Sequence, residues 1–220
     1  MILAAGKGTR MGSLTAARPK PLLELNGMML IGRQLRRLAA GSIRDVVINL
    51  SYRGDMIRAA VGDGSRFGVR VIYAEEGPEP LETAGGIINA LPLLGDSPFL
   101  VVNADVVSDF EFGDLALGDA LGTLVLVPNP PHSPRGDYGI DATSVLTHDE
   151  PKYTFAGISL LSPALFAGLA PGRRPLSQVF EHAIRSRSLR GQIHAGLWFD
   201  VGTADRLAEA SAALELREAT

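Results

Sequence analysis

The stretch Ile-Leu-Ala-Ala-Gly-Lys-Gly-Thr-Arg-Met, residues 2–11, decides the fold. Its first four residues are apolar and predict a buried strand, and glycines at positions 6 and 8 predict a tight turn where that strand ends. In such a turn the backbone N–H groups can face inward and hold phosphate oxygens, an approach that larger side chains would obstruct. The stretch therefore predicts a phosphate-binding loop after the first strand of an α/β sheet.

Two common nucleotide motifs do not fit this loop. The P-loop pattern GxxxxGK[ST] is absent, because no Gly-Lys-Ser/Thr follows a glycine at the required spacing. The dinucleotide fingerprint GxGxxG begins at Gly6 and Gly8 but has Met11 at its third glycine position. The next predicted strand ends in Asn-Leu-Ser at 49–51 and lacks the acidic residue that would bind a ribose. We therefore expect a different kind of phosphate chemistry.

Hydrophobic periodicity along the chain predicts alternating strands and helices in the first half. Near-continuous apolar runs favour a parallel sheet covered by helices on both faces. After about residue 128 four clustered prolines interrupt the alternation and shorter strands follow, within what we expect to be one domain. We predict strands at 2–5, 45–50, 69–74, 99–103, 121–128, within 137–147, and at 152–161, 188–195 and 198–201, and helices at 29–40, 53–61, 84–94, 111–116, 175–186 and 203–217.

Charge and composition exclude several classes of protein. The 220 residues include 21 basic and 24 acidic side chains, and the net charge of −3 disfavours binding to nucleic acid. The absence of cysteine excludes a disulfide scaffold, a thiolate metal site and a cysteine nucleophile. No apolar run reaches the roughly 18–20 residues of a membrane span, and the opening residues lack the pattern of a secretory signal. We therefore expect a cytoplasmic enzyme that does not bind membranes, and a monomer, with a dimer as the alternative.

Two basic residues follow the first predicted strand closely. Arg10 lies in the glycine-rich loop, and Lys20 lies in the segment Arg-Pro-Lys-Pro-Leu at 18–22. A guanidinium group can hold triphosphate oxygens as a fork, whereas an ammonium group is a point charge suited to the phosphate that is attacked. The alternative interpretation is a surface turn that is basic by chance.

Two carboxylates come at the ends of apolar strands. Asp105, with Asn103 two residues before it, follows the fourth predicted strand, and Asp200 follows the pair Trp-Phe. In open α/β sheets ligands bind at the carboxyl ends of the strands. Mg²⁺ is commonly held by one or two carboxylates, with phosphate oxygens and waters as the other ligands. Both aspartates are therefore candidate Mg²⁺ ligands, and Asp200 has a second interpretation as the N-cap of the helix after Gly202.

The glycine-rich loop together with Pro-Lys-Pro-Leu resembles the signature of the sugar-phosphate nucleotidylyltransferases. The resemblance implies a Rossmann-like three-layer nucleotidyltransferase fold of the GT-A-like type, with a mixed, mainly parallel central sheet and a β-rich sugar-binding part. It implies a nucleoside triphosphate and a sugar 1-phosphate as substrates and Mg²⁺ as cofactor. It assigns catalytic roles to Arg10, Lys20, Asp105 and Asp200, the two aspartates as ligands of Mg²⁺.

The same resemblance implies which residues bind each substrate. Residues 1–127 would form the nucleotide-binding half of the domain, and residues 128–220 the sugar-phosphate-binding half. Glu82 stands where many members of the family have glycine, and Lys152 receives no role because it lies nearer to the following Ala-Gly-Ile strand than the family's lysine does. The nucleotide would contact Leu3, Ala4, Ala5, Gly6, Gly8, Thr9, Arg10, Lys20, Ala84 and Gly85, and the sugar would contact Asn103, Gly136, Asp137 and Gly157.

One branch of the family is the most similar to this sequence. The segments at 4–11, 62–68, 79–87, 92–106, 135–138 and 198–203 look like those of the uridylyltransferases that act on N-acetylmuramic acid 1-phosphate in cell-wall recycling. The chain ends too early for the β-helical acyltransferase that some members append, so a monofunctional enzyme is expected. The alternatives are a related enzyme that forms a GDP-heptose, a dTDP-sugar or a CDP-alcohol, and a non-catalytic sensor of sugar nucleotides.

Overall fold

The computed structural model describes residues 1–218, which fall into two compact units that alternate along the sequence. The first unit comprises Ile2–Pro80, Asn103–Asp109 and the described chain from Leu197 onward. The second unit comprises Leu81–Val102 and Phe110–Gly196, together with Met1. Each unit is therefore assembled from segments that are distant in the sequence.

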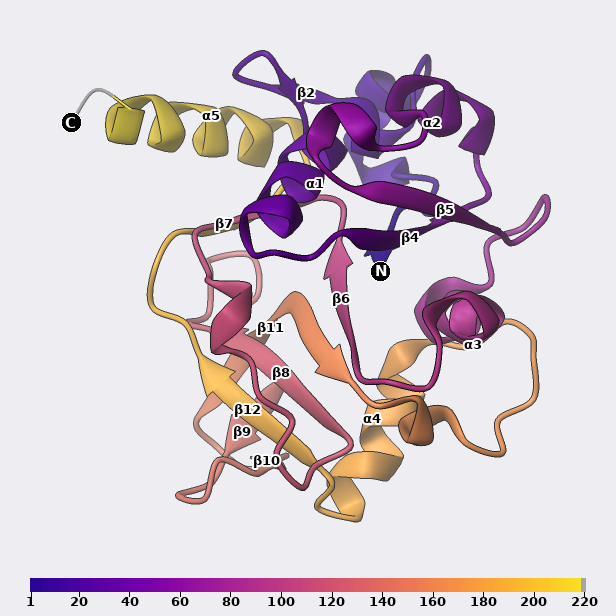
Figure 1. Cartoon of the computed structure of the whole chain (residues 1–220). Helices are drawn as coiled ribbons and strands as arrows, with labels where there is room; N and C mark the ends of the chain where they lie inside the picture. The colour runs from indigo at the N-terminus through magenta and orange to yellow at the C-terminus, as the bar shows by residue number, and fades with distance from the viewer. Residues whose placement is uncertain (219–220) are drawn as a thin grey trace. The chain divides into compact units, whose positions relative to one another are not determined.

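The first unit contains a short parallel sheet, whose strands β4 and β5 are labelled in Figure 1. The strand β1 (Ile2–Leu3) pairs with β4 (Asp45–Leu50), and β4 pairs with β5 (Arg70–Glu75). Every residue of β4 after its first is buried, as expected for a central parallel strand with both faces covered. The helices are α1 (Leu30–Ala40), α2 (Gly54–Val61) and α5 (Ala204–Glu218).

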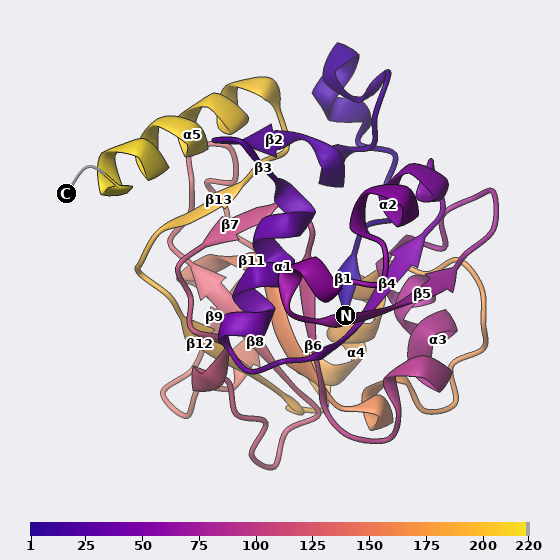
Figure 2. The ribbon, with the colours of Figure 1, turned by 45° about the horizontal axis from the view of Figure 1, so that its top comes forward.

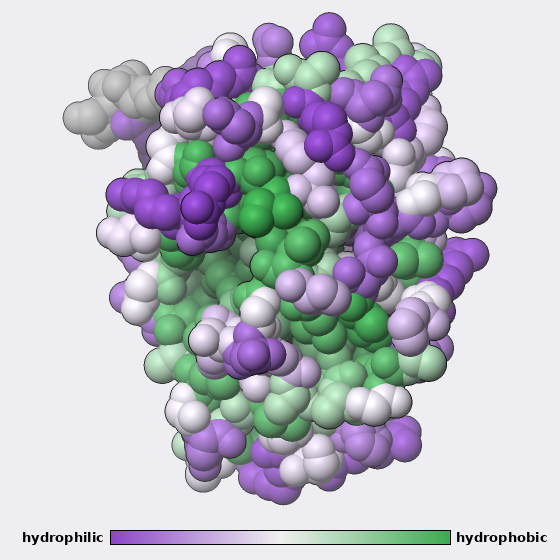
Figure 3. All heavy atoms as spheres, turned by 45° about the vertical axis from the view of Figure 1, so that its right-hand side comes forward, coloured by the Kyte–Doolittle hydropathy of each residue, from purple (hydrophilic) through white to green (hydrophobic). Residues whose placement is uncertain are grey.

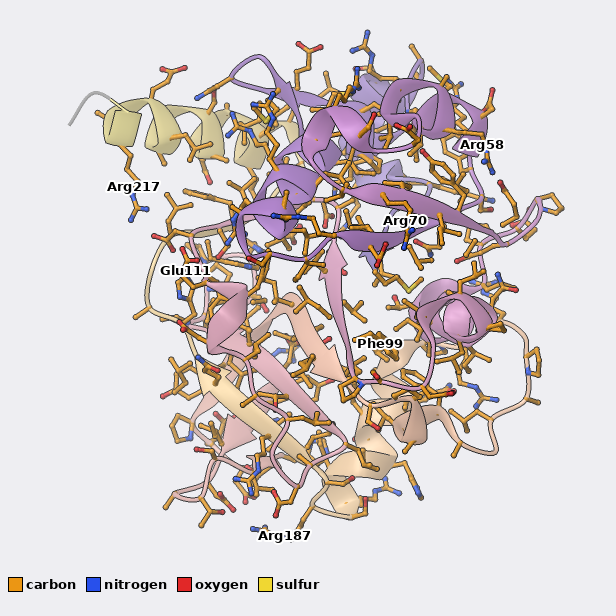
Figure 4. The ribbon with its side chains drawn as sticks, in the orientation of Figure 1. Arg58, Arg70, Phe99, Glu111, Arg187 and Arg217 are labelled. Carbon is orange, nitrogen blue, oxygen red and sulfur yellow. The ribbon has the colours of Figure 1, made fainter. Side chains whose placement is uncertain are left out.

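The helix α2 lies beside β5 in both ribbon views (Figures 1 and 2). The guanidinium of Arg58 lies over the ring of Tyr73, 4.3 Å from its centroid, and pairs with Glu75. At the start of β5, Nε of Arg70 donates to Asp45 of the neighbouring strand β4 at 2.7 Å. Both arginines are labelled in Figure 4 and are largely exposed, so each pair contributes at most about 1 kcal/mol.

Shorter elements of the first unit hold most of the residues predicted for catalysis. The strand β7 follows Asp105 directly and pairs antiparallel with β13, which ends at Asp200. These short elements are η1 (Thr9–Thr15), η2 (Lys20–Leu22), β2 (Glu24–Leu25), β3 (Met28–Met29), η3 (Ser65–Phe67), β7 (Val106–Ser108) and β13 (Trp198–Asp200).

Antiparallel pairing dominates the second unit. The long strand β11 lies between β6 and β8 and is antiparallel to both, while β8 pairs in parallel with β12. The helix α4 contacts β12 and β10. The elements are α3 (Glu82–Leu94), β6 (Phe99–Asn103), η4 (Phe112–Asp114), β8 (Gly122–Val127), β9 (Tyr138–Ile140), β10 (Leu146–Thr147), β11 (Lys152–Leu161), η5 (Pro163–Phe166), α4 (Leu176–Arg185) and β12 (Leu189–Ile193).

The predicted α/β fold with a mixed, mainly parallel central sheet is confirmed, and one element is corrected. The helix expected at 111–116 is only the single 3-10 turn η4, because Gly113 lies inside it and the chain is extended again at Leu115.

No described helix is long and apolar enough to cross a membrane. On the face drawn in Figure 3, hydrophilic side chains dominate the margins and hydrophobic ones gather towards the middle.

Candidate active site

The glycine-rich loop leaves the carboxyl end of β1 with free backbone donors. Gly8 adopts a left-handed conformation, with φ 63° and ψ 28°, and its carbonyl accepts from the N–H of Met11 at 3.0 Å. Within residues 1–218, the N–H groups of Ala5, Gly6 and Gly8 have no hydrogen-bond partner. A Cβ added to Gly6 would meet no atom within 4 Å. The loop therefore offers open space lined by unpaired N–H groups, which suits an anion.

The base of this loop is fixed by hydrogen bonds to neighbouring strands. The buried side chain of Asn49 accepts from the N–H of Ala4 at 2.7 Å and donates to Glu76 at 2.6 Å. The carbonyl of Leu3 accepts from the N–H of Ala104 at 3.1 Å. The N–H of Ala4 and the carbonyl of Leu3, both in the predicted nucleotide-binding set, thus already have partners within the protein.

Lys20 and Asp105 form an ion pair in which Nζ donates to the Asp105 carboxylate. The Lys20 side chain is 11% exposed and that of Asp105 is 24% exposed. Pro19 fixes the entry to η2 in an extended conformation, and its carbonyl accepts from the N–H of Leu22 at 3.0 Å. A nearly buried ammonium requires a nearby negative charge, so the contact between these two predicted residues is a defining feature of the site.

The stem of Lys20 packs directly on Gly8. A Cβ at Gly8 would lie 3.1 Å from Cβ of Lys20 and 3.2 Å from Cγ2 of Thr15, and the residue would have to keep a positive φ. We expect Gly8→Ala to lower the free energy of unfolding by about 2–3 kcal/mol, because backbone strain and a close contact add. Chemical denaturation measures this loss.

Gly27→Ala is the matched control for Gly8→Ala. Gly27 also has a positive φ, 71°, but a Cβ there would meet no atom within 4 Å. Its substitution should cost only the strain, about 1 kcal/mol. Equal losses for the two variants would contradict the packing role assigned to Gly8.

Asp200 lies beside the turn that carries Asp105. Asp200 is opposite Val106 in the pairing of β13 with β7, and the N–H of Val201 donates to the carbonyl of Asp105 at 3.0 Å. The Asp200 carboxylate accepts from Nη1 of Arg206 at 2.8 Å, and the Arg206 side chain is 12% exposed. Two carboxylates, each with a basic partner, therefore come from the end of β13 and from the turn that precedes β7.

The N-cap interpretation of Asp200 is wrong. The helix α5 begins at Ala204, and its first-turn N–H at Arg206 donates to Oγ1 of Thr203 at 3.3 Å. Thr203 therefore caps the helix. Asp200 remains available for a role at the site, with Arg206 as its partner.

One apolar cluster supports all the segments that carry these groups. Met11 follows Arg10, Val107 lies two residues after Asp105, and Val201 follows Asp200. Met11, which stands at the third glycine position of the dinucleotide fingerprint, is therefore a core residue here. The buried cluster consists of Met11, Leu23, Leu25, Leu30, Val107, Val201 and Ala210, with Leu197, Phe199, Leu207 and Leu214 packed against it.

Arg10 is the free cation of the loop. Its side chain is exposed and has no ion pair or hydrogen bond within the described residues. The far end of the loop is held instead by Arg53, whose guanidinium donates to the carbonyls of Ala16, at 2.6 Å, and Ala17. The loop is thus anchored at both ends, while Arg10 remains available to an anionic ligand.

The donor set of Asp105 and Asp200 fits a magnesium ion. Both supply carboxylate oxygens, the ligand type that Mg²⁺ prefers. In the described part of the chain no group of three or more His, Cys, Asp or Glu side chains could form a site from protein ligands alone. Two carboxylates that leave positions for phosphate oxygens and water match the usual way in which proteins bind this ion.

The nucleotide-binding residues predicted in the second unit are tied to the segment before α4. The N–H groups of Ala84 and Gly85 both donate to the carbonyl of Arg174, at 3.0 and 3.1 Å. A Cβ at Gly85 would lie 2.3 Å from the carbonyl oxygen of Gly172, so only glycine fits. Glu82 takes a positive φ of 60°, the conformation that favours glycine, and pairs with an exposed arginine, Arg173, at 2.8 Å.

The predicted sugar-binding residues of the second unit line β11. The N–H of Asp137 donates to the carbonyl of Tyr153, and its carboxylate accepts from the N–H of Phe155, both at 2.8 Å. Gly136 is required because its φ is 63° and a Cβ there would lie 2.9 Å from the backbone carbonyl carbon of Lys152. Gly157, with φ 73°, lies where the pairing of β11 with β8 shifts register.

Tyr138 follows this segment and stays protonated near neutral pH. Its burial raises the pKa of the phenol to about 12, and the charges of Asp137 and Glu181 act in the same direction. The ring meets Phe180 edge to face at 6.3 Å between centroids. Tyr138 is therefore a neutral, packed side chain beside the predicted sugar-binding turn.

Three residues of the first unit that sequence reasoning overlooked support the site: Gln34, Asn49 and Arg206. Gln34 and Asn49 could have been noticed in the sequence, because each is a polar residue on an otherwise buried apolar face. Arg206 carried none, since nothing in its helix distinguishes it from an ordinary exposed arginine. Buried polar residues within apolar patterns thus mark positions that satisfy backbone groups near the site.

The fold and these residues define a nucleotidyltransferase. The family model described as Nucleotidyl transferase matches residues 1–143, and the chain belongs to this family, as predicted. More particularly, the chain is 44% identical over 222 residues to the N-acetylmuramate alpha-1-phosphate uridylyltransferase of Neisseria meningitidis serogroup B, with 96% of each chain covered. It is also 30% identical to the enzyme of the same name from Caulobacter vibrioides. That alignment covers 100% of this chain and 97% of the Caulobacter enzyme.

A solved structure shares the fold at lower sequence identity. HddC from Yersinia pseudotuberculosis, complexed with GMP-PN, superposes with a TM-score of 0.81 over 97% of both chains at 22% identity. This likeness concerns the fold alone.

Proposed function

We propose that this protein transfers a uridylyl group from UTP to N-acetylmuramic acid 1-phosphate, giving UDP-N-acetylmuramic acid and pyrophosphate. The observation that supports this substrate pair best is the 44% identity to the Neisseria enzyme over nearly the whole of both chains. The contact between Lys20 and Asp105 supports the reaction class, because the lysine whose stem packs on Gly8 of the phosphate-binding loop pairs with a carboxylate. Peptidoglycan recycling in the cytoplasm is the corresponding setting.

The proposed reaction needs no protein nucleophile. An oxygen of the sugar 1-phosphate attacks the α-phosphorus of UTP and forms a new P–O bond, while the bond from that phosphorus to the bridging oxygen of pyrophosphate breaks. Both reactants are polyanions, so alignment and charge neutralisation supply the rate enhancement. Arg10 binds triphosphate oxygens, the loop N–H groups hold them in place, and Lys20 neutralises the phosphate that is attacked.

Asp105 and Asp200 would hold Mg²⁺, which neutralises phosphate charge and orients the triphosphate when bound. Lys20 and Arg206 pair with these two carboxylates and orient them in the protein itself. In this proposal the two aspartates are preorganised metal ligands. Lys20 of η2 orients Asp105, and Arg206 of α5 orients Asp200.

In this proposal the two substrates bind to different halves of the sequence. Residues 1–127 bind the nucleotide, through the loop at 3–10 together with Ala84 and Gly85. Residues 128–220 contribute most of the sugar site through Gly136, Asp137 and Gly157, and Asn103 adds a contact from β6. Because both N–H groups at 84 and 85 donate to Arg174, a base bound there would be recognised by other backbone groups of this segment.

The proposed function is tested by measuring pyrophosphate release from a grid of substrates. UTP, dTTP, GTP, CTP and ATP are each combined with several sugar 1-phosphates, including N-acetylmuramic acid 1-phosphate, with and without Mg²⁺. We expect UTP with N-acetylmuramic acid 1-phosphate to give the highest kcat/KM, and chelation of the metal to abolish turnover. Preference for GTP with a heptose phosphate would overturn the uridylyl assignment, and no activity with any pair would favour a sensor.

A further inference from the structure

We propose that Gln34 is a positioning residue that fixes the turn carrying Asp105. The inference rests on the proposed function, because Asp105 matters there as a charged ligand. Gln34 lies in the middle of α1 and is 1% exposed. Its neighbours on the same helix face are apolar, so a polar side chain at this position calls for a specific reason.

The reason is a pair of hydrogen bonds to the two ends of one turn. Ala104 and Asp105 form the turn between β6, which ends at Asn103, and β7, which begins at Val106. The amide nitrogen of Gln34 donates to the carbonyl of Asn103 at 3.1 Å and to the carbonyl of Val106 at 2.6 Å. One side chain thus spans the turn and uses both of its N–H bonds.

The orientation of the Gln34 amide follows from its surroundings. Only the NH₂ end can face two carbonyl oxygens, since the opposite orientation would place three oxygens together. The oxygen of the Gln34 amide is buried and has no partner within the described residues. A buried acceptor without a partner lowers the stability of the folded protein. The two hydrogen bonds that Gln34 donates to the turn are therefore made at the expense of its own amide oxygen.

Other contacts to the turn act on different groups. The N–H of Ala104 donates to the carbonyl of Leu3, the carbonyl of Asp105 accepts from the N–H of Val201, and Lys20 pairs with the carboxylate. None of these holds the carbonyls at the two ends of the turn. Gln34 therefore supplies a constraint that fixes how the Asp105 side chain is presented to Lys20.

Gln34→Met is the principal test, because it keeps the length of the side chain and removes both donors. We expect kcat to fall at least tenfold while KM for both substrates changes less than threefold, since displacement of a catalytic group by about 1 Å can cost 100-fold in rate. Amide hydrogen exchange of residues 103–107, measured without substrate or metal, should become faster. Leu38→Val, one turn further along α1, is the control and should change neither kcat nor this exchange selectively.

Gln34→Glu adds a readout that loss of packing alone would not change. The introduced carboxyl can donate to the turn only when it is protonated, and its charged form would repel both carbonyls. Burial raises the pKa of a carboxyl group, so the ratio of variant to wild-type kcat should fall as pH rises. Neither Gln34→Met nor Leu38→Val should show this dependence.

The outcomes separate this inference from the proposed function. Wild-type kcat retained by Gln34→Met overturns the inference whether or not exchange becomes faster, as does unchanged exchange in the turn. A wild-type protein without activity on any substrate pair overturns the proposed function, and the exchange measurement then decides alone whether Gln34 holds the turn.

Discussion

Lys20→Met should lower kcat about 100- to 1,000-fold, comparable to the loss of one preorganised charge-stabilising group at an active site. The substitution keeps the stem that packs on Gly8 but removes the ammonium that pairs with Asp105. It also leaves a carboxylate that is 24% exposed without its partner, so the free energy of unfolding should fall by about 1–3 kcal/mol. Steady-state kinetics and denaturation measure the two effects separately.

The double variant Lys20→Met with Asp105→Asn separates catalysis from folding. It removes both charges of the pair, so most of the lost stability should return while activity stays low. Lys7→Met is the control for the chemical change alone, because Lys7 forms an exposed pair with Glu79 at 3.1 Å and its side chain is 46% exposed. We expect Lys7→Met to change stability by less than about 0.5 kcal/mol. Wild-type turnover in Lys20→Met at saturating substrate would refute the role of Lys20.

The sequence predicted those parts of the fold whose local pattern and tertiary environment agree. The strand β4 has the predicted bounds, Asp45–Leu50, because the run that follows Asp45 is buried on both faces as in a central parallel strand. Helix α1 follows its periodic apolar face within one residue. The strand β7 was not predicted, since its three residues form a strand only by pairing with β13, about 90 positions later in the chain. A short strand made by a distant partner has no local signal.

In the candidate site, too, features that depend on local sequence could be predicted, whereas contacts between distant segments could not. The loop and Lys20 could be read from the sequence because glycines and prolines mark conformations that few other residues adopt. That Lys20 touches Asp105, and that Arg206 pairs with Asp200, depends on the packing of segments around the cluster that includes Met11. Residue types and spacing alone do not encode those contacts.

Asp200→Asn should lower kcat/KM about 100- to 1,000-fold, because a neutral amide is a poor ligand for Mg²⁺. The fold should survive, since the amide oxygen can still accept the hydrogen bond from Arg206 that the structure shows at 2.8 Å. A weakened metal site also predicts that the Mg²⁺ concentration for half-maximal rate rises by at least tenfold. Kinetics at varied Mg²⁺ and fixed nucleotide measure both quantities.

Glu209→Gln is the matched control for this loss of one negative charge. Glu209 is exposed on α5 and lies near Asp200 in the sequence, but it belongs to the solvent-facing part of that helix. Its substitution should leave the Mg²⁺ dependence unchanged and alter kcat/KM less than threefold.

Trp198 is the single tryptophan of the chain and lies in β13, the strand that ends at Asp200. Its fluorescence, measured as Mg²⁺ is added, therefore reports metal binding near Asp200 independently of turnover. If Asp200→Asn shows the wild-type Mg²⁺ dependence in both measurements, Asp200 is not a metal ligand, and Asp105 would have to hold the ion without it.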